Sequence, residues 1–381
     1  MVAKHKVADI LRHHEKELDG WCANPWKSRT LHAIRKCRTA ELGGHIDKCN
    51  CCNRLHLSYN SCRNRHCPTC QGHKREQWIE ARREELLEIP YFHVVFTIPH
   101  ELNGLCLANP KLAYATLFKT AWATLAGFSK NPTYLDARIG AIMLLHTWGS
   151  NLSLHPHLHC IVPSGGVDKY GEWKRSKNKG GFLFPVKEMS RVFRAKFVGE
   201  LRKKKAEVSQ EIYDRLFSKD WVVFSKQAFG TPNSVVEYLG RYSHKIAIAN
   251  SRIVEIDNQK DTVTINCKNY REGGKKQLLT LTQKEFVRRF SMHILPKGFT
   301  RIRHYGILSG TWKKQHLKQL QEKLNRGSRP KPRETKLHRC PYCKKGTLEP
   351  ICVFPKNRPP PNIAGRIKTH NRQIDKDLQK G

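Results

Sequence analysis

Apolar residues follow two different spacings along the chain, and the changes of spacing outline the predicted elements. Helical spacing predicts short helices over residues 5–18 and about 30–38, and a further helix after Gln71 that ends at Pro90. Between these helices, residues 43–70 show little periodicity and are rich in Cys, Asn, His and Arg. Such a profile is typical of a loop module that is organised by metal.

The middle of the chain alternates apolar strands with helical segments. Strands are predicted over 91–98, 140–148, 155–162, 221–229, 252–256, 261–268 and 276–282. Helices are predicted around 110–128 and over 186–206, 233–249 and 282–293. Strands separated by helices in this order favour an α+β fold built on a sheet.

Charge narrows the class of partner. The 381 residues include 70 Lys and Arg against 32 Asp and Glu, a formal net charge of +38, which indicates a nucleic-acid partner. Beyond Thr311 the basic excess continues through "RPKPRE" and "RPPPN", so this tail is predicted to be loosely ordered until something acidic binds it. No run of about 18 apolar residues occurs and the charged start is not a signal peptide, so we expect a cytoplasmic protein with no membrane partner.

Cysteines point to a metal site. Seven of the fourteen lie between Cys37 and Cys70, and in a reducing cytosol such clustering favours metal binding over disulfides. Two C-x2-C pairs predict one four-thiolate zinc site formed by Cys49, Cys52, Cys67 and Cys70. Because four protein ligands leave no open position for substrate, the predicted role of this zinc is structural.

Other residues leave the zinc ligand set open. The candidates to replace a ligand, or to bind a second ion, are Cys62, Cys37, Cys51, His45 and His66. In the tail, Cys340 and Cys343 form half of a second knuckle, which Cys352 and His338 are candidates to complete. The zinc module is expected to present basic side chains to DNA or RNA, namely Arg54, Arg63, Arg65 and Lys74.

The stretch "HPHLHCIV" raises a second metal hypothesis. His155, His157 and His159 occupy alternate positions of a predicted strand, so their rings share one face. His157 and His159 are the preferred ligands for a divalent cation with open positions, and His155, at the start of the strand, is the third candidate. His93 and His146 stand alone on apolar strands and are expected to be ordinary core residues.

A nucleophile is available downstream. Tyr238 and Tyr242 are one turn apart on the predicted helix 233–249, and Lys245 lies on the same face. Aromatic residues at this spacing often belong to a helix core, but the apolar residues of this helix form a face that is largely offset from the tyrosines. A phenol becomes a nucleophile when a cation stabilises its negative charge, and Lys245 could supply that cation.

Two histidines on one strand followed by tyrosines on a downstream helix resemble the HUH endonuclease superfamily, and "YSHK" matches its tyrosine-x-x-lysine pattern. The sequence is most similar to the two-tyrosine rolling-circle transposases of bacterial insertion sequences. The segments that carry this resemblance are "CRTAELGGH", "SCRNRHCPTCQ", "YFHVVFTIPHELN", "LHTWGSNLSLHPHLHCIVPSGG", "YLGRYSHKIAIANSRI" and "HILPKGFTRIRHYGIL". They span roughly residues 37–308 in the expected order.

The resemblance implies a fold and a division into domains. The fold class is α+β: an HUH nuclease domain with a central antiparallel sheet and a tyrosine-bearing helix, plus an N-terminal zinc-binding module. The corresponding parts are a helical and zinc-binding DNA-binding domain over 1–89, the nuclease domain over 90–310 and a basic C-terminal extension over 311–381.

The resemblance also implies a reaction. His157 and His159 would hold Mg²⁺ or Mn²⁺, and Tyr238 or Tyr242 would attack a DNA phosphate, leaving a 5′-phosphotyrosine and a free 3′-OH. The expected partners are single-stranded DNA and transposon-end DNA, which Arg241 is expected to contact. No nucleotide cofactor is expected, and the chain lacks a G-x-x-x-x-G-K-[ST] loop. The alternatives are a plasmid rolling-circle replication initiator and a non-catalytic zinc-containing nucleic-acid-binding protein.

Overall fold

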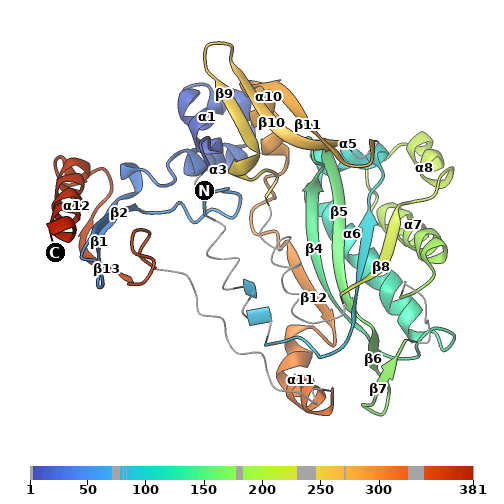
Figure 1. Ribbon diagram of the computed structural model, residues 1–381. Coiled ribbons are helices and arrows are strands. Elements are labelled where there is room, and N and C mark those ends of the chain that lie inside the picture. The colour runs from blue at the N-terminus through green and yellow to red at the C-terminus, as the bar shows by residue number, and fades with distance from the viewer. Residues whose placement is uncertain are drawn as a thin grey trace.

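A computed structural model describes residues 3–70, 78–79, 81–82, 84–176, 183–229, 246–269, 272–324 and 339–380. Its central sheet has five strands in the order β12-β4-β5-β3-β8, and each neighbouring pair is antiparallel (Figure 1). These strands are β3 Tyr91–Thr97, β4 Gly140–Trp148, β5 Leu154–Pro163, β8 Val223–Phe229 and β12 Ile302–Gly306. The predicted α+β class with a central antiparallel sheet is confirmed.

Helices cover one face of the central sheet. They are α6 Pro110–Lys130 and α7 Val186–Lys203, with the shorter η2 His100–Leu102, α5 Asn103–Ala108 and α8 Gln210–Phe217. Phe96 of β3 and Leu158 of β5 are fully buried in this layer, where Phe96 packs edge-on against Phe193 of α7. Both faces of β4 and β5 are largely buried, which explains why these strands read as nearly continuous apolar runs in the sequence.

The opposite face of the sheet has an apolar end and a polar end. Residues 84–90 and α11 Gly310–Leu324 cover the apolar end, where Ile142, Leu144 and Ile161 are buried. Because side chains on one face recur every second residue, the same face continues along β4 and β5 to positions occupied by histidines. Packing at the apolar end therefore fixes the face of the sheet on which these histidines lie.

The N-terminal helices share a core with a second sheet. The helices are α1 Val7–His13, α2 Leu18–Trp21 and α3 Pro25–Arg35. The sheet, in the order β11-β10-β9, comprises β9 Ile253–Asp257, β10 Thr262–Asn269 and β11 Lys275–Thr282, and α10 Gln283–Met292 follows it. Ile10 and Leu31 are fully buried in the same cluster as Ile265, Phe286 and Phe290. Segments far apart in the sequence thus form one hydrophobic core.

A third sheet joins the two ends of the chain. Its order is β13-β1-β2, with β1 Gly44–Cys49, β2 Leu55–Tyr59 and β13 Leu348–Phe354, and α12 Ile363–Lys380 lies against β2 (Figure 1). The prediction of a loosely ordered tail beyond Thr311 is therefore wrong for residues 339–380, and it is also wrong for residues 311–324, which belong to helix α11. Local sequence could not reveal this strand, because its partner lies at the other end of the chain.

Several boundaries differ from the predictions. The helix predicted over 5–18 is interrupted between α1 and α2, and the module over 43–70 contains two strands where only loops were predicted. The predicted helix 233–249 lies outside the described residues up to Lys245, and residues 246–249 are not helical. The remaining short elements are η1 Ala40–Leu42, β6 Gly165–Val167, β7 Trp173–Arg175 and η3 Asn250–Arg252. Among the described residues, no helix is both long and apolar enough to cross a membrane.

Candidate metal centres

Three histidines from β4 and β5 converge at the polar end of the central sheet. The strand register sets His146 of β4 directly opposite His157 of β5, and His159 follows two residues later on the same face. One ring nitrogen from each of the three lies within 4.8 Å of the other two, and the Nε2 atoms of His157 and His159 are 3.1 Å apart. Imidazoles that converge in this way can share one divalent cation.

Contacts on the outer side of the rings orient their nitrogens. Nδ1 of His157 lies 2.6 Å from the backbone oxygen of His155, and because a carbonyl only accepts, Nδ1 carries the hydrogen. In the neutral ring, Nε2 of His157 then holds the lone pair. Nδ1 of His159 lies 2.8 Å from Nε2 of His93 on β3, whose ring is almost parallel to it at 12°. Outer contacts of this kind fix the ligand rings in metal sites.

The surroundings favour neutral imidazoles. Burial lowers the pKa of His157 to about 4, and it lowers the pKa of His93 to about 4 as well. Leu158, between the two β5 ligand candidates, is fully buried on the helical face and so keeps its neighbours on the polar face. Neutral imidazole is the form that binds a metal, so this environment fits a cation site.

The structure thus brings together His157 and His159, the predicted pair, and adds the ring of His146, which was not predicted as a ligand. His155, the third candidate, contributes its carbonyl to His157, and its ring is not part of the cluster of three. His146 and His93, expected to be core residues, both adjoin His159. His146 and His93 are each the single histidine of a predicted strand, so only the pairing of these strands with β5 reveals that they lie beside His159.

The expected nucleophile segment falls outside the described residues. It contains Tyr238, Arg241, Tyr242 and Lys245. The described chain resumes at Ile246, which lines a small cavity together with Thr147 and Trp148 at the end of β4. Trp148 stacks on His146, with ring centroids 4.6 Å apart. The chain therefore re-enters beside the strand that carries one of the three converging histidines.

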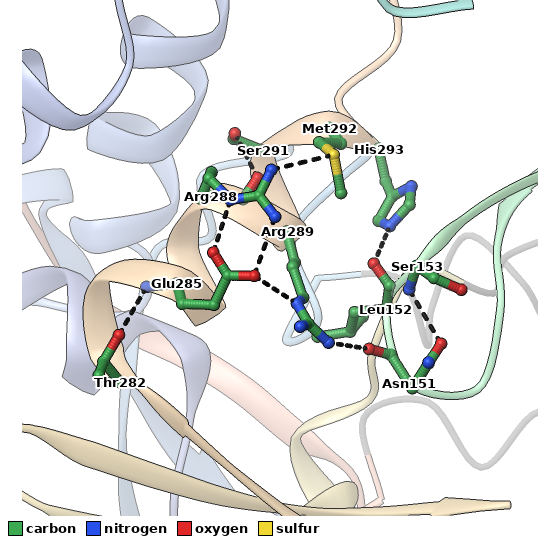
Figure 2. A network of polar contacts seen from close by, with 10 residues as sticks. All are labelled: Asn151, Leu152, Ser153, Thr282, Glu285, Arg288, Arg289, Ser291, Met292 and His293. Carbon is green, nitrogen blue, oxygen red and sulfur yellow. Dashed lines mark hydrogen bonds and ion pairs between the residues drawn. The ribbon is translucent and has the colours of Figure 1, made fainter. Parts of the chain in front are cut away.

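A polar network begins on α10 and reaches the loop between β4 and β5 (Figure 2). Thr282 caps the helix, since its Oγ1 accepts a hydrogen bond of 3.2 Å from the backbone N–H of Glu285. Arg288 and Arg289 both donate to the Glu285 carboxylate, and they hold its pKa at about 2. Arg289 also donates to the backbone oxygen of Asn151 at 3.1 Å.

His293, directly after α10, holds the same loop (Figure 2). Its Nε2 donates to the backbone oxygen of Leu152 at 3.1 Å, and its Nδ1 lies 3.1 Å from Oγ1 of Thr147. Leu152 has a φ of 63°, a left-handed conformation that costs a non-glycine residue about 1 kcal/mol or more. These contacts stabilise that conformation, and they fix the loop that leads into the histidine-bearing strand β5.

Eight cysteines form two groups of four. The first group is Cys37, Cys62, Cys67 and Cys70. The Sγ atom of Cys70 lies 3.2 Å from that of Cys37 and 3.5 Å from that of Cys62. Four thiolates around a zinc ion, with Zn–S bonds of about 2.3 Å, lie about 3.8 Å from one another. The group therefore has nearly the size of a tetrahedral zinc site.

The second group is Cys49, Cys52, Cys340 and Cys343, and it combines residues from both ends of the chain. The Sγ distances are 3.7 Å from Cys49 to Cys343 and 3.7 Å from Cys52 to Cys340. These distances agree with the edge of a tetrahedral four-thiolate site, about 3.8 Å. The donor set and its dimensions both fit zinc.

This grouping differs from the predicted set of Cys49, Cys52, Cys67 and Cys70. Each C-x2-C knuckle contributes both of its cysteines to one group, as its spacing indicates, but the two knuckles belong to different groups. The β1–β2 hairpin directs the first knuckle toward the C-terminal segment, whereas the second lies near the end of α3. Of the other candidates, Cys62 and Cys37 complete the first group. Cys51, His45, His66 and Cys352 belong to neither group, and His338 lies outside the described residues.

Two of the basic residues expected to contact DNA make contacts within the chain. Arg54 pairs with Asp375 of α12, and Arg65 donates to two backbone oxygens in the segment after α10. Arg63 is exposed, and Lys74 lies outside the described residues. These contacts of Arg54 and Arg65 hold the cysteine-rich module against other parts of the chain.

Comparisons with known proteins agree on two parts of the chain. A family model described as "Transposase zinc-binding domain" matches residues 9–98, which include the whole first cysteine group. A family model described as "Putative transposase" matches residues 140–316, which include the three converging histidines.

Two relatives are also named as transposases. The protein named "Putative transposase y4qJ" from Sinorhizobium fredii is 39% identical over 391 residues, which cover 93% of this chain and 97% of that protein. The protein named "Transposase for insertion sequence element IS801" from Pseudomonas savastanoi pv. phaseolicola is 29% identical over 312 residues, which cover 77% of this chain and 73% of that protein.

Proposed function

The chain belongs to the IS91 family of insertion-sequence transposases, and on that basis we propose that it nicks and rejoins single-stranded DNA by tyrosine transesterification during rolling-circle transposition. The observation that carries this proposal is the convergence of His146, His157 and His159 within the part of the chain that the transposase model matches. Among the described residues this group has three imidazole ligands and no fourth, which suits a catalytic cation better than a structural one.

His146, His157 and His159 would hold a divalent cation, Mg²⁺ or Mn²⁺. When bound, such an ion supplies Lewis acidity to the scissile phosphate. The protein's own contribution is positioning: the His155 carbonyl fixes the Nδ1 hydrogen of His157, and His93 orients the ring of His159. The rigid β4–β5 pair keeps the rings in place before DNA binds.

Tyr238 or Tyr242 would supply the nucleophile. The phenolic oxygen attacks the phosphorus, the bond from phosphorus to the 3′ oxygen breaks, and the tyrosine stays joined to the 5′ phosphate. The phenol loses one proton and the leaving 3′ oxygen gains one, so the step balances. Lys245 would stabilise the phenolate charge. Ile246, the first described residue after this segment, lies beside the end of β4, the strand that carries His146. This position supports a role for the segment at the histidine cluster.

Rejoining would reverse the same chemistry. A free 3′-OH attacks the phosphotyrosine, and the second tyrosine allows two strands to be held at once. Because the ester conserves the energy of the broken phosphodiester, the exchange needs no nucleotide cofactor. The net charge of +38 supports a DNA substrate, and the first cysteine group, within the matched zinc-binding domain, fits a structural zinc ion.

The test uses single-stranded oligonucleotides copied from each end of the element that encodes the chain, with the duplex as a control. Wild-type protein with Mg²⁺ or Mn²⁺ should cut one strand and form a covalent adduct, and mass spectrometry should map that adduct to Tyr238 or Tyr242. Replacing both by Phe should abolish the adduct while DNA binding persists. An adduct that survives in this double variant, or cleavage without any adduct, would contradict the proposal.

A further inference from the structure

The second cysteine group has a feature that its spacing alone does not reveal: its two knuckles have matching backbones. Asn53 N–H donates to the Cys49 carbonyl at 3.0 Å, and Lys344 N–H donates to the Cys340 carbonyl at 3.0 Å. The donor residue directly follows the second cysteine in both knuckles, and its φ is positive in both, 55° for Asn53 and 59° for Lys344. Two segments without a shared sequence context thus adopt the same loop around their thiols.

Backbone amides point at the sulfur atoms of both knuckles. Cys49 Sγ accepts from the N–H groups of Cys51 and Cys52 at 3.4 and 3.5 Å, and Cys343 Sγ accepts from the N–H of Gly346 at 3.4 Å. Amides directed at sulfur stabilise thiolate, the form that binds a metal. One sulfur in each knuckle, Cys49 Sγ and Cys343 Sγ, is therefore stabilised as a thiolate.

Gly346 shows how closely the two knuckles approach each other. A Cβ at this position would lie 2.6 Å from Sγ of Cys49 and 2.5 Å from Cβ of Cys51, so only glycine fits here without movement of the first knuckle. The separation of 3.7 Å between sulfurs excludes disulfides between these pairs, since an S–S bond is about 2.05 Å long. The remaining use for four thiols at this distance is a shared metal ion.

Contacts around the group align the C-terminal knuckle with the N-terminal one. Asn50 Oδ1 accepts from the backbone N–H of Thr347 at 2.9 Å, and Cys49 is paired with Leu348 at the start of β13. On the far side of the sheet, Asn371 of α12 bonds both the N–H and the carbonyl of Leu55, at 2.8 and 2.9 Å. The C-terminal segment is thus docked in a register that brings its cysteines to the first pair.

We propose that Cys49, Cys52, Cys340 and Cys343 bind a second structural zinc ion, which fastens residues 339–380 to the N-terminal sheet. The zinc-binding family model ends at residue 98, so it contains only half of this site. With four protein ligands, the ion has no open position for substrate, and its role is to join the chain ends. This inference does not depend on the transesterification proposed above.

The first test counts metal ions in the full-length protein by plasma mass spectrometry. His146, His157 and His159 are replaced by Ala in every sample, so that zinc on the histidines does not enter the count. This background should carry about two zinc ions per chain. Adding Cys340→Ser and Cys343→Ser should remove about one of them, and the matched control Cys352→Ser, a half-buried cysteine of β13 outside both groups, should remove none. An unchanged count in the Cys340/Cys343 variant, or iron in place of zinc, would overturn the proposal.

The second test uses the unmodified chain, so it does not require a variant to fold. Iodoacetamide labelling followed by peptide mass spectrometry should find Cys49, Cys52, Cys340 and Cys343 protected together and exposed together once a chelator removes the metal. Cys51, which is exposed, should react in both conditions. Cys52 and Cys343 are only half-buried, so their rapid alkylation before chelation would contradict a bound ion.

Discussion

The histidine cluster and the second cysteine group are both candidate metal centres, but they are assembled in opposite ways. Two adjacent strands of the central sheet supply the histidines, and direct pairing of His146 with His157 sets their spacing. The cysteines come from knuckles 288 to 294 residues apart and meet at the edge of a small sheet. Folding of the central sheet therefore creates the histidine cluster, whereas the second cysteine group depends on docking of the C-terminal segment.

Because of this difference, loss of the metal should affect the stability of the fold differently at the two kinds of site. The central sheet is held by the apolar layer under α6 and α7, so the histidines can lose their metal without loss of the fold. At the cysteine groups the metal contributes directly to folding, as in other structural zinc sites. The second group depends on it most, because its four cysteines lie outside the hydrophobic clusters of the described residues. Substitutions at the cysteines should therefore lower stability, and substitutions at the histidines should lower activity while the fold persists.

The largest effect is expected at the first cysteine group. Cys67→Ser with Cys70→Ser should remove its zinc and destabilise the N-terminal helices by more than about 5 kcal/mol, because structural zinc can contribute about 10 kcal/mol or more to small domains. Thermal unfolding and zinc content measure the effect. Cys22→Ala, in the same core but outside the group, is the control and should retain zinc. Normal zinc content and stability in the double variant would end the claim of a structural ion.

The histidine cluster should show the reverse pattern. His157→Ala with His159→Ala should lower metal-dependent DNA cleavage by more than about 100-fold. The free energy of unfolding should change by less than about 2 kcal/mol, because the apolar layer on the other face of the sheet stays intact. Denaturant unfolding and a cleavage assay separate the two quantities. His100→Ala, at an exposed position, serves as the control. Full cleavage by the double variant would remove the histidines from the mechanism.

A finer test concerns His93, which orients His159 through a contact of 2.8 Å between ring nitrogens. His93→Ala should weaken Mn²⁺ binding about 10- to 100-fold, the usual range for residues that position a ligand. His93→Gln, which can still form a hydrogen bond, should recover part of the loss. Titration with Mn²⁺ measures both variants, and equal affinities for wild type and His93→Ala would show that His93 has no positioning role.

The smallest effect is expected in the network that fixes the β4–β5 loop. Glu285→Gln should destabilise the protein by about 1 kcal/mol, since the carboxylate accepts from two arginines. The folded-state pKa of Glu285, about 2, is below its ordinary value of 4.5, so this contribution is complete above about pH 4.5 and is lost as the pH falls toward 2. Unfolding measured against pH should show the two proteins converge over that interval. Glu211→Gln, which removes an exposed helical pair, should change stability little at any pH.

The sequence was most informative where a site is local. Alternating positions within one strand identified His157 and His159, and C-x2-C spacing identified each knuckle as a pair of ligands. Strands β3, β4 and β5 were recognisable because their apolar runs are nearly continuous, whereas β12 of the same sheet was not predicted. In each case, residues a few positions apart in the sequence carry the signal.

What the sequence did not reveal depends on long-range pairing. His146 joins the cluster because β4 lies beside β5, and Cys340 joins Cys49 because β13 pairs with β1. No local pattern specifies which knuckle completes which site, so the first prediction combined the two knuckles nearest in sequence. The ordered C-terminal segment was missed for the same reason, since its strand and helix are stabilised by docking and not by their own composition.

If the rings on β4 and β5 hold a divalent cation, then Mn²⁺ added to the full-length protein should be bonded to their nitrogens. Electron spin-echo envelope modulation detects nitrogen nuclei bonded to Mn²⁺. We expect imidazole nitrogen couplings in the wild type that disappear when His146, His157 and His159 are replaced by Ala. Bound Mn²⁺ without nitrogen couplings, or the same couplings in the triple variant, would contradict it.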